Sequence, residues 1–290
     1  MTTAGPRPRR SALYMPGANE RALEKARTLP ADALILDLED SVAPDAKREA
    51  RRRVAAAVAS GEYGHREVTV RVNAPGTPWH ADDLRAAAEA GPDAVVVPKV
   101  DSARTVREVE AALEAAGAPD RTAIWAMVET PVAMFDARAV AAAGERLTVL
   151  VLGTNDLVKE LHAEHVPGRA PLLTALSMAL LAARAEGKVI LDGVYNDVQD
   201  LAGFEAEARQ GRQLGFDGKT LVHPRQVEPC NRIFAPAPEE VERSHRIIAA
   251  FEEATSQGRG VVTVDGRMVE NLHVEEARRV LALAAAVAGR

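Results

Sequence analysis

Eight short apolar runs alternate along this chain with alanine-rich segments of helical period, and this alternation restricts the fold more than any other feature. The runs cover residues 11–15, 32–38, 68–72, 93–100, 122–129, 147–153, 188–194 and 217–223. Most are too short for helices, and several are rich in β-branched residues, which suits parallel strands buried on both faces. Helices are expected between them, at residues 19–28, 45–59, 81–90, 102–116, 132–143, 172–186, 200–214 and 224–234. Eight strand–helix repeats predict an α/β fold of the (β/α)8 TIM-barrel type, and a doubly wound open sheet is the alternative.

The repeat ends near Pro236, and a different pattern follows it. A helix is expected over about 238–257, then a short hairpin around Asp265-Gly266, then a last helix over about 273–288. The simplest division is therefore a barrel at 1–235 and a C-terminal extension at 236–290. We expect the extension to pack on its own barrel or on a neighbouring subunit.

Composition excludes several classes of protein. The formal net charge is −6 and aromatic residues make up 3% of the chain, which argues against binding to nucleic acid or to a membrane surface. No run approaches the roughly 18 apolar residues of a membrane-spanning helix. Cys230 is the only cysteine, so there is no intrachain disulfide and no cysteine metal cage. We therefore expect a cytoplasmic protein without nucleic-acid or membrane partners.

Common catalytic motifs are also missing from the sequence. There is no histidine pair with the spacing of a zinc protease, no phosphate-binding P-loop and no GxGxxG after an expected strand. There is no serine in a nucleophile-elbow pattern either. These absences argue against a zinc protease, against nucleotide-cofactor oxidoreduction and against a serine hydrolase of the nucleophile-elbow type.

Polar side chains stand at the end of nearly every expected strand. In chain order they are Asp37, Glu39 and Asp40, then Arg71 and Asn73, then Lys99, Glu129, Thr154, Asn155, Asp156, Asp192 and His223. A single carboxylate after a strand is usually structural. In a barrel, however, the carboxyl ends of the strands surround one axis, and the loops there build the active site.

Two of these carboxylates, Glu129 and Asp156, follow neighbouring strands. Together with waters they would give an octahedral Mg²⁺ site, because this cation prefers hard oxygen ligands and keeps several waters. Arg71 offers a planar fork for a substrate carboxylate, which lysine would hold less specifically.

At these residues the chain resembles a known family. "SALYMPGANERALEKA" (11–26), "ADALILDLEDSVAPDAKREAR" (31–51), "VVVPKVDS" (95–102), "MVETP" (127–131), "VLGTNDL" (151–157) and "GFDGKTLVHPRQV" (215–227) are similar to segments of the citrate lyase β-subunit-like proteins, within the HpcH/HpaI aldolase superfamily. The resemblance covers essentially the whole chain, in order. It implies a (β/α)8 barrel, Mg²⁺ as cofactor, CoA-thioester and α-keto acid partners, and a homotrimer or hexamer.

The resemblance also implies roles for single residues. Glu129 and Asp156 would be the metal ligands, and Arg71 would hold the carboxylate of the keto acid. Glu39 and Asp40 would line the water shell of the metal and orient Arg71.

Further residues would bind substrate by the same resemblance. Pro98 and Lys99 belong to the fourth-strand pattern of the family, and Lys25 matches a position near the CoA phosphates. Backbone amides of the "GTND" segment are expected to position the keto acid; the residues concerned are Gly153, Thr154 and Asn155.

One position departs from the family. Many relatives carry aspartate in a C-terminal "MVD" motif and donate it to the active site of a neighbouring subunit. This chain has Glu270 in "RMVENLH", one methylene longer. A shift near 1 Å costs about two orders of magnitude in rate. Three readings of Glu270 therefore stay open: a catalytic residue with an altered reach, a residue that serves an altered substrate, or a structural residue.

The expected activity is that of a Mg²⁺-dependent carbon–carbon lyase. It would cleave or form a 3-hydroxyacyl-CoA thioester, such as malyl-, citramalyl- or citryl-CoA, with acetyl-CoA and an α-keto acid as the other side of the reaction. Three alternatives stay open: a malyl-CoA thioesterase or malate-synthase-type activity in the same site, a CoA-independent pyruvate aldolase, and a carrier-dependent citryl lyase subunit.

Overall fold

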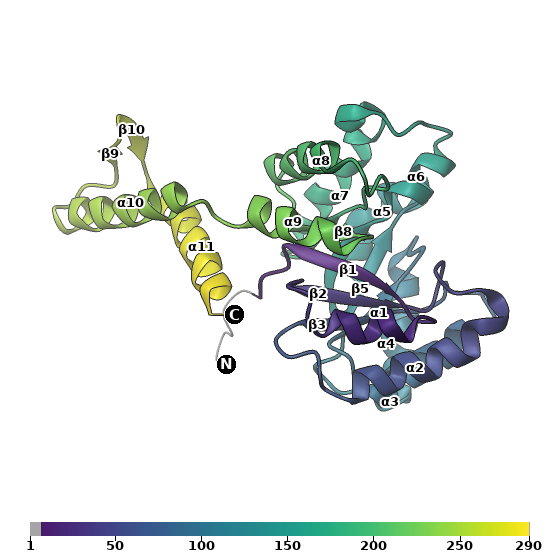
Figure 1. Cartoon of the computed structure of the whole chain (residues 1–290). Coiled ribbons are helices and arrows are strands. Elements are labelled where there is room, and N and C mark those ends of the chain that lie inside the picture. Colours follow the sequence, from purple (N-terminus) through teal and green to yellow (C-terminus); the bar gives the residue numbers. More distant parts are fainter. Residues whose placement is uncertain (1–6, 290) are drawn as a thin grey trace. The chain divides into compact units, whose positions relative to one another are not determined.

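The structure, a computed structural model, describes residues 7–289. They form two compact units, which are shown in Figure 1. One unit spans Arg9–Arg232, and the other takes in the chain from Ile233 onward.

Eight parallel strands form a closed barrel in the first unit, with β1 pairing to both β2 and β8. This confirms the predicted (β/α)8 fold and excludes the open sheet. The strands are β1 (Ser11–Pro16), β2 (Ala33–Asp37), β3 (Glu67–Arg71), β4 (Ala94–Val97), β5 (Ala123–Val128), β6 (Leu147–Leu152), β7 (Val189–Asp192) and β8 (Gly218–Leu221).

Helices follow the strands and form the outer layer of the barrel (Figure 1). They are α1 (Glu20–Ala26), α2 (Lys47–Ala59), α3 (His80–Ala90), α4 (Ala103–Ala115), α5 (Pro131–Ala141), α6 (Thr154–Glu160), α7 (Leu173–Ala185), α8 (Leu201–Leu214) and α9 (Val227–Phe234). Three short 3₁₀ segments, η1 (Pro44–Ala46), η2 (Pro167–Leu172) and η3 (Pro224–Gln226), lie in the connections.

The barrel interior is filled by alternate residues of the strands, as a period of two requires. They form one buried cluster of mostly small and branched side chains around Trp125, namely Ala12, Ala33, Ile35, Ala94, Val96, Trp125, Met127, Val149, Val151 and Leu191. The outward residues are buried under the helices. Continuous apolar runs therefore form strands buried on both faces.

Local signals place the helix ends. Ser102 caps α4 by accepting a hydrogen bond from the backbone N–H of Thr105 at 3.4 Å, as expected from the sequence. Helix α6 was not expected as a separate element. It has seven residues, too few for a periodic pattern to be recognised, and it begins directly at the "TND" sequence after β6.

The second unit contains α10 (Pro238–Ser256), β9 (Val262–Val264), β10 (Arg267–Val269) and α11 (Asn271–Ala288). The predicted hairpin is confirmed, because β9 and β10 pair antiparallel across Asp265 and Gly266, whose φ values are 49° and 74°. Apolar residues of the two helices and the hairpin form a small core of their own.

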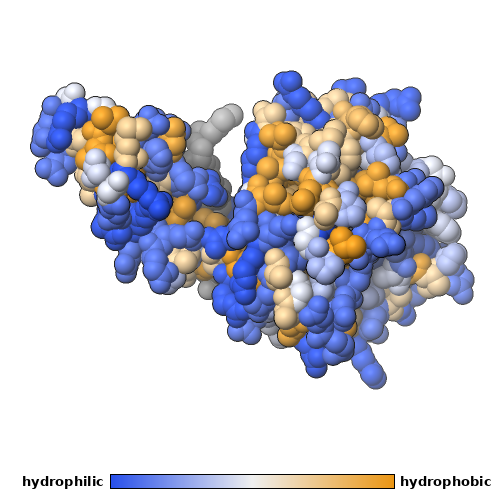
Figure 2. Space-filling view, turned by 90° about the horizontal axis from the view of Figure 1, so that it is seen from above, coloured by the Kyte–Doolittle hydropathy of each residue, from blue (hydrophilic) through white to orange (hydrophobic). Residues whose placement is uncertain are grey.

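Hydrophobic side chains also reach the surface of the barrel unit (Figure 2). Phe135 on α5 is 83% exposed and Leu181 on α7 is 68% exposed, and these two helices contact each other. Within residues 7–289, no helix combines the length and the apolarity that crossing a membrane requires.

Candidate active site

The carboxyl ends of the barrel strands surround a cavity of about 390 Å³. The sequence predicted polar residues at this end of the barrel. Eight of the residues singled out from the sequence line the cavity: Asp37, Asp40, Arg71, Glu129, Gly153, Thr154, Asn155 and Asp156.

Glu129 follows β5 and is fixed from two sides by backbone. Its Oε1 accepts a hydrogen bond of 2.7 Å from the backbone N–H of Lys99. Lys99 has a φ of 53°, a left-handed conformation that costs energy in a non-glycine residue. On the other side, a Cβ atom at Gly153 would lie 2.0 Å from Oε2 of Glu129, so only glycine leaves room for this carboxylate.

Asp156 lies in the first turn of α6 and shares the cavity with Glu129. Its Oδ1 is 3.8 Å from Nζ of Lys99. Burial, and then the negative charges of Asp156 and Glu39, raise the pKa of Glu129 to about 7. Ionising Glu129 is therefore costly chiefly because its carboxyl is buried, and the neighbouring carboxylates add to that cost.

The donor set fits a hard divalent cation. Glu129 and Asp156 would hold such a cation, and its charge would favour the ionised carboxylate against the burial and the like charges that raise the pKa of Glu129. The buried Oγ1 of Thr154 also lines the cavity and has no hydrogen-bond partner within residues 7–289. No group of three or more His, Cys, Asp or Glu side chains in those residues is arranged to hold a metal. Two carboxylates completed by waters are thus the arrangement that the site offers to Mg²⁺.

Arg71, at the end of β3, is held in place mainly by Asp37. Its Nε and Nη2 donate to the two Asp37 oxygens at 2.6 and 2.8 Å, and Nη1 lies 2.7 Å from Oε2 of Glu39. Asp40 is 3.7 Å from Nη1, and its side chain is 72% exposed. Of the five N–H groups of a guanidinium, three are engaged by Asp37 and Glu39, so two stay available to a substrate carboxylate.

Asp37 and Arg71 stabilise each other's charges. Burial opposes the ionisation of Asp37, but the charge and hydrogen bonds of Arg71 lower the pKa of Asp37 below its ordinary value. Burial raises the pKa of Glu39 to about 7 in spite of Arg71. Sequence reasoning gave the orienting role to Glu39 and Asp40. The structure gives most of it to Asp37, which the same "LDLED" motif contains.

Tyr14, on β1, covers the face of Arg71. The Tyr14 ring centroid lies 4.8 Å from Cζ of Arg71, and its hydroxyl is 3.9 Å from Sδ of Met127. Burial raises the pKa of Tyr14 above its ordinary value, so the ring stays neutral. Sequence reasoning treated Tyr14 only as part of a strand, although its alternation with Ala12 puts it on the inner face. Apolar side chains complete this wall of the cavity: Met127, Leu152, Val194 and Val222.

Lys47, at the start of α2, holds the loop that carries Glu39. Its Nζ donates to the backbone oxygens of Leu38 and Glu39 at 2.9 and 2.8 Å, and it lies 5.2 Å from the ring centroid of Trp79. Lys47 is buried, so both bonds are shielded from water. No sequence pattern indicates this contact, apart from a lysine ten residues after the end of β2.

The other predicted residues lie outside the cavity lining. Glu39 and Lys99 contact lining residues, whereas Pro98 is buried directly before Lys99. Lys25 is exposed on α1. Glu270 is in the second unit at the N-cap of α11, where its backbone N–H donates to Nδ1 of His273 at 3.2 Å.

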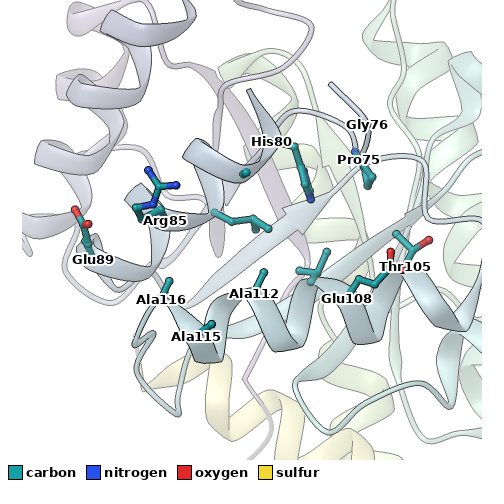
Figure 3. Close-up of a pocket in the computed structure, with 13 residues that line it drawn as sticks. Pro75, Gly76, His80, Arg85, Glu89, Thr105, Glu108, Ala112, Ala115 and Ala116 are labelled. Atoms are coloured by element: carbon teal, nitrogen blue, oxygen red, sulfur yellow. The ribbon is translucent and has the colours of Figure 1, made fainter. Parts of the chain in front are cut away.

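Two of the other cavities within residues 7–289 lie away from the barrel mouth. One, of about 680 Å³, is a groove between α3 and α4, with Arg85 and Glu89 on one side and Glu108 and Ala112 on the other (Figure 3). The other, of about 510 Å³, lies between η2 and α8. Neither contains Arg71 or the candidate metal ligands, so the barrel mouth is the candidate active site.

Known proteins are similar to this chain in sequence and in fold. Residues 10–224 match the HpcH/HpaI aldolase/citrate lyase family. The chain is 52% identical over 281 residues to a (3S)-malyl-CoA thioesterase of Cereibacter sphaeroides (strain KD131), covering 97% of this chain and 96% of that protein. It is 41% identical to the citrate lyase subunit beta of Escherichia coli (strain K12), covering 96% and 94%.

A solved structure is similar over nearly the whole length. The protein CitE from Mycobacterium tuberculosis, in complex with magnesium, acetoacetate and coenzyme A, has a TM-score of 0.79 and 30% sequence identity, covering 98% of this chain and 100% of that chain. By fold, by family match and by the identity of its relatives, this chain belongs to the HpcH/HpaI aldolase/citrate lyase family.

Proposed function

We propose that this chain is a Mg²⁺-dependent enzyme that hydrolyses the CoA thioester of a short 3-hydroxy dicarboxylic acid, (3S)-malyl-CoA or a close analogue. The observation that carries the proposal is the meeting of Glu129, Asp156 and Arg71 in one cavity. Metal ligands and a carboxylate-binding fork together suit a substrate with neighbouring hydroxyl and carboxylate groups.

Different residues of the cavity would bind the substrate carboxylate and the metal. The two available N–H groups of Arg71 would bind the free carboxylate of the substrate. Glu129 and Asp156 would hold Mg²⁺, which when bound polarises coordinated oxygens and stabilises negative charge on them. Tyr14 and the apolar wall would exclude bulk water and strengthen these contacts.

Hydrolysis of the thioester at this site needs one water and one base. The oxygen of a water attacks the thioester carbonyl carbon while a base takes one proton of that water. The C–S bond then breaks, the base passes this proton to the leaving sulfur, and the CoA thiol and the free hydroxy acid are released. We assign the base to Glu270, supplied by a neighbouring subunit of a homotrimer or hexamer. Lys25 would lie near the CoA phosphates.

The relatives support hydrolysis and leave one second candidate. The relative at 52% identity is a (3S)-malyl-CoA thioesterase. The relative at 41% is a citrate lyase subunit, which favours C–C cleavage of the same substrate to acetyl-CoA and an α-keto acid. Both reactions need the same anchoring of carboxylate and hydroxyl.

Product analysis separates the two candidates. Purified protein with Mg²⁺ is given malyl-, citramalyl- and citryl-CoA, and free thiol, α-keto acid and hydroxy acid are followed. We expect thiol and malate in equal amounts from malyl-CoA, without glyoxylate. Glyoxylate with acetyl-CoA would establish the lyase instead, and no turnover of any of the three would contradict the proposed substrate class.

Two variants connect this activity to the site. Arg71→Lys loses the planar fork, and we expect kcat/KM to fall at least about 100-fold, the range in which a lost bidentate charged contact lies. Glu164→Gln, on the η2–α8 cavity, is the matched control and should retain full activity.

A further inference from the structure

Helix α6 carries Asp156, and its first turn is not held by a side-chain cap. The N-cap position is Gly153, which makes no side-chain capping hydrogen bond. Instead, the first two residues of the helix, Thr154 and Asn155, both contact the segment that follows β7.

Thr154 packs against Gly193 without any spare room. A Cβ atom at residue 193 would lie 2.4 Å from Oγ1 and 2.5 Å from Cγ2 of Thr154. The backbone at Gly193 therefore sets how far the start of α6 can move toward β7.

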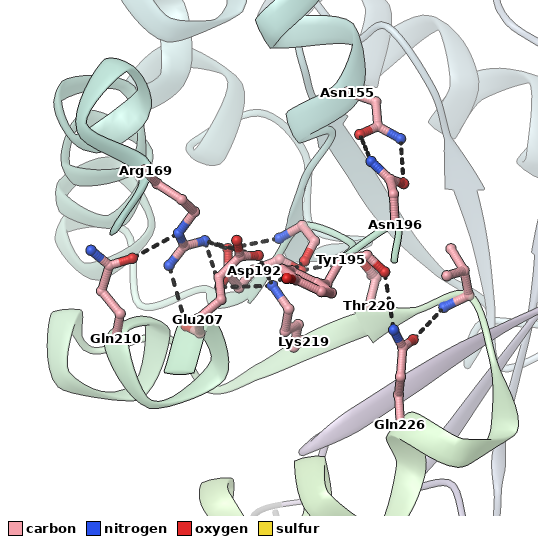
Figure 4. A network of polar contacts seen from close by, with 12 residues as sticks. Asn155, Arg169, Asp192, Tyr195, Asn196, Glu207, Gln210, Lys219, Thr220 and Gln226 are labelled. Carbon is pink, nitrogen blue, oxygen red and sulfur yellow. Dashed lines mark hydrogen bonds and ion pairs between the residues drawn. The ribbon is translucent and has the colours of Figure 1, made fainter. Parts of the chain in front are cut away.

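Asn155 is joined to Asn196 by two reciprocal amide hydrogen bonds (Figure 4). Nδ2 of Asn155 donates at 3.1 Å and Nδ2 of Asn196 donates back at 2.7 Å. Both side chains are exposed, so a substitution of Asn196 removes the bridge without opening the core. The residue after Asn155 is Asp156.

The segment after β7 is itself held by hydrogen bonds from β8 and η3. Backbone pairing between the two strands ends at Asp192 and Lys219. Beyond these residues, side chains donate hydrogen bonds to the backbone of the segment after β7. Three donors bind backbone oxygens there (Figure 4): Thr220 Oγ1 to Asp192 at 3.1 Å, Lys219 Nζ to Gly193 at 2.5 Å, and Gln226 Nε2 to Tyr195 at 3.0 Å. We call residues 192–196 the β7 end.

A buried charge cluster anchors this arrangement. Lys219 and Asp192 are completely buried, with Nζ of Lys219 3.2 Å from Asp192 and 2.8 Å from Glu207. Nη1 of Arg169 reaches Asp192 at 2.6 Å. Two cations and two anions thus compensate each other, which buried charges require, and Asp192 also accepts the backbone N–H of Gly193 at 2.8 Å.

We propose that the β7 end positions Asp156, and that Asn196 and Lys219 are positioning residues for the metal site. The charge cluster holds the segment that contains Gly193 and Asn196. Gly193 packs against Thr154, and Asn196 bonds to Asn155, which directly precedes Asp156 in α6. This inference rests on the proposed role of Asp156 as a metal ligand. Substitution of residues that orient metal ligands typically lowers metal affinity about 10–100-fold.

The test measures binding of Mn²⁺, a spectroscopic substitute for Mg²⁺, to the full chain by electron paramagnetic resonance. We expect Asn196→Ala to weaken Mn²⁺ binding about tenfold while the thermal unfolding midpoint stays close to that of the wild type. Asn155→Ala should weaken it similarly, and the double variant should be no weaker than Asn155→Ala alone, because both substitutions break one bridge.

Gln210→Ala is the matched control. Gln210 accepts from Nε of Arg169 at 2.8 Å and donates to Gly168 at 2.7 Å, so it touches the same cluster without touching the β7 end. It should bind Mn²⁺ like the wild type. Unchanged affinity in Asn196→Ala, or equal weakening in Gln210→Ala, overturns the positioning role alone. A wild-type chain that binds no Mn²⁺ overturns the metal site of the proposed function as well.

Discussion

Glu129 lies where a carboxylate is costly to ionise, because its side chain is nearly inaccessible to water and two other carboxylates are close. Burial first, and then Asp156 and Glu39, raise the pKa of Glu129 to about 7. The chain keeps the group in place with the strained backbone of Lys99 and with Gly153. A cation held by this carboxylate would favour its ionised form, so the same features that raise the pKa of Glu129 suit a metal ligand.

The raised pKa makes Mg²⁺ binding depend on pH. Below about pH 7 the ion must displace a proton from Glu129, so we expect Mg²⁺ affinity to increase from pH 6 to pH 8, by up to about tenfold per pH unit below the pKa. Calorimetry in two buffers of different ionisation enthalpy should detect the released proton. Affinity that is independent of pH over this range would contradict the burial argument.

The same shift has a consequence for the stability of the metal-free protein. A carboxyl whose pKa is higher in the folded state stabilises the fold at low pH, and this contribution is lost as pH rises through about 7. Melting temperatures with chelator should therefore decline between about pH 5 and pH 8, and Mg²⁺ should recover the loss at the upper end.

Among the elements, the β2–α2 loop depends on a single buried cation. Lys47 binds the carbonyls of Leu38 and Glu39, and so fixes the loop from which Glu39 reaches Arg71. We expect Lys47→Met to lower the free energy of unfolding by about 1–3 kcal/mol, and to raise KM for the CoA ester more than it lowers kcat.

Lys188→Met provides the comparison for Lys47. Lys188 donates to the backbone oxygen of Leu147 at 2.7 Å, at the start of β6 and β7 and thus at the far end of the barrel. It should lose stability without a change in KM. If both variants changed KM alike, Lys47 would act only through global stability.

Elements that a local sequence pattern determines could be predicted, whereas contacts between side chains of different elements could not. The barrel strands were recognisable because each is a continuous buried run, and their closure brought Arg71, Glu129 and Asp156 into one cavity. Helix α6 was missed because it is short. The Asp37–Arg71 pair, the Lys47 contact and the β7 end were not predicted, since side chains from different elements make them and no local pattern records such contacts.

At the scale of the whole molecule, the second unit carries Glu270, the base in the proposed reaction. Its hairpin and α11 hold Glu270 at a helix N-cap, and the barrel exposes apolar side chains such as Phe135 on α5 and Leu181 on α7. Exposed apolar side chains suit the assembly that we propose. In such an assembly Glu270 would serve the barrel of a neighbour.

Complementation tests this donation directly. Glu270→Gln and Asp156→Asn should each lower kcat about 100-fold or more when assayed alone. Coexpressed as mixed oligomers they should recover part of the activity, because some sites then receive an intact Glu270 next to an intact Asp156. Glu275→Gln, on the exposed face of α11, is the control and should stay active. A mixture as inactive as its parents would exclude donation between subunits.

The claim on which the account depends is that Glu129 and Asp156 bind one divalent cation together. The most direct measurement is a Mn²⁺ titration of the wild type, Glu129→Gln, Asp156→Asn and the control Glu164→Gln, with folding checked by circular dichroism. The account predicts one ion per chain in the wild type and the control, and binding weakened at least about 100-fold in both carboxamide variants. Wild-type affinity in either carboxamide variant would contradict it.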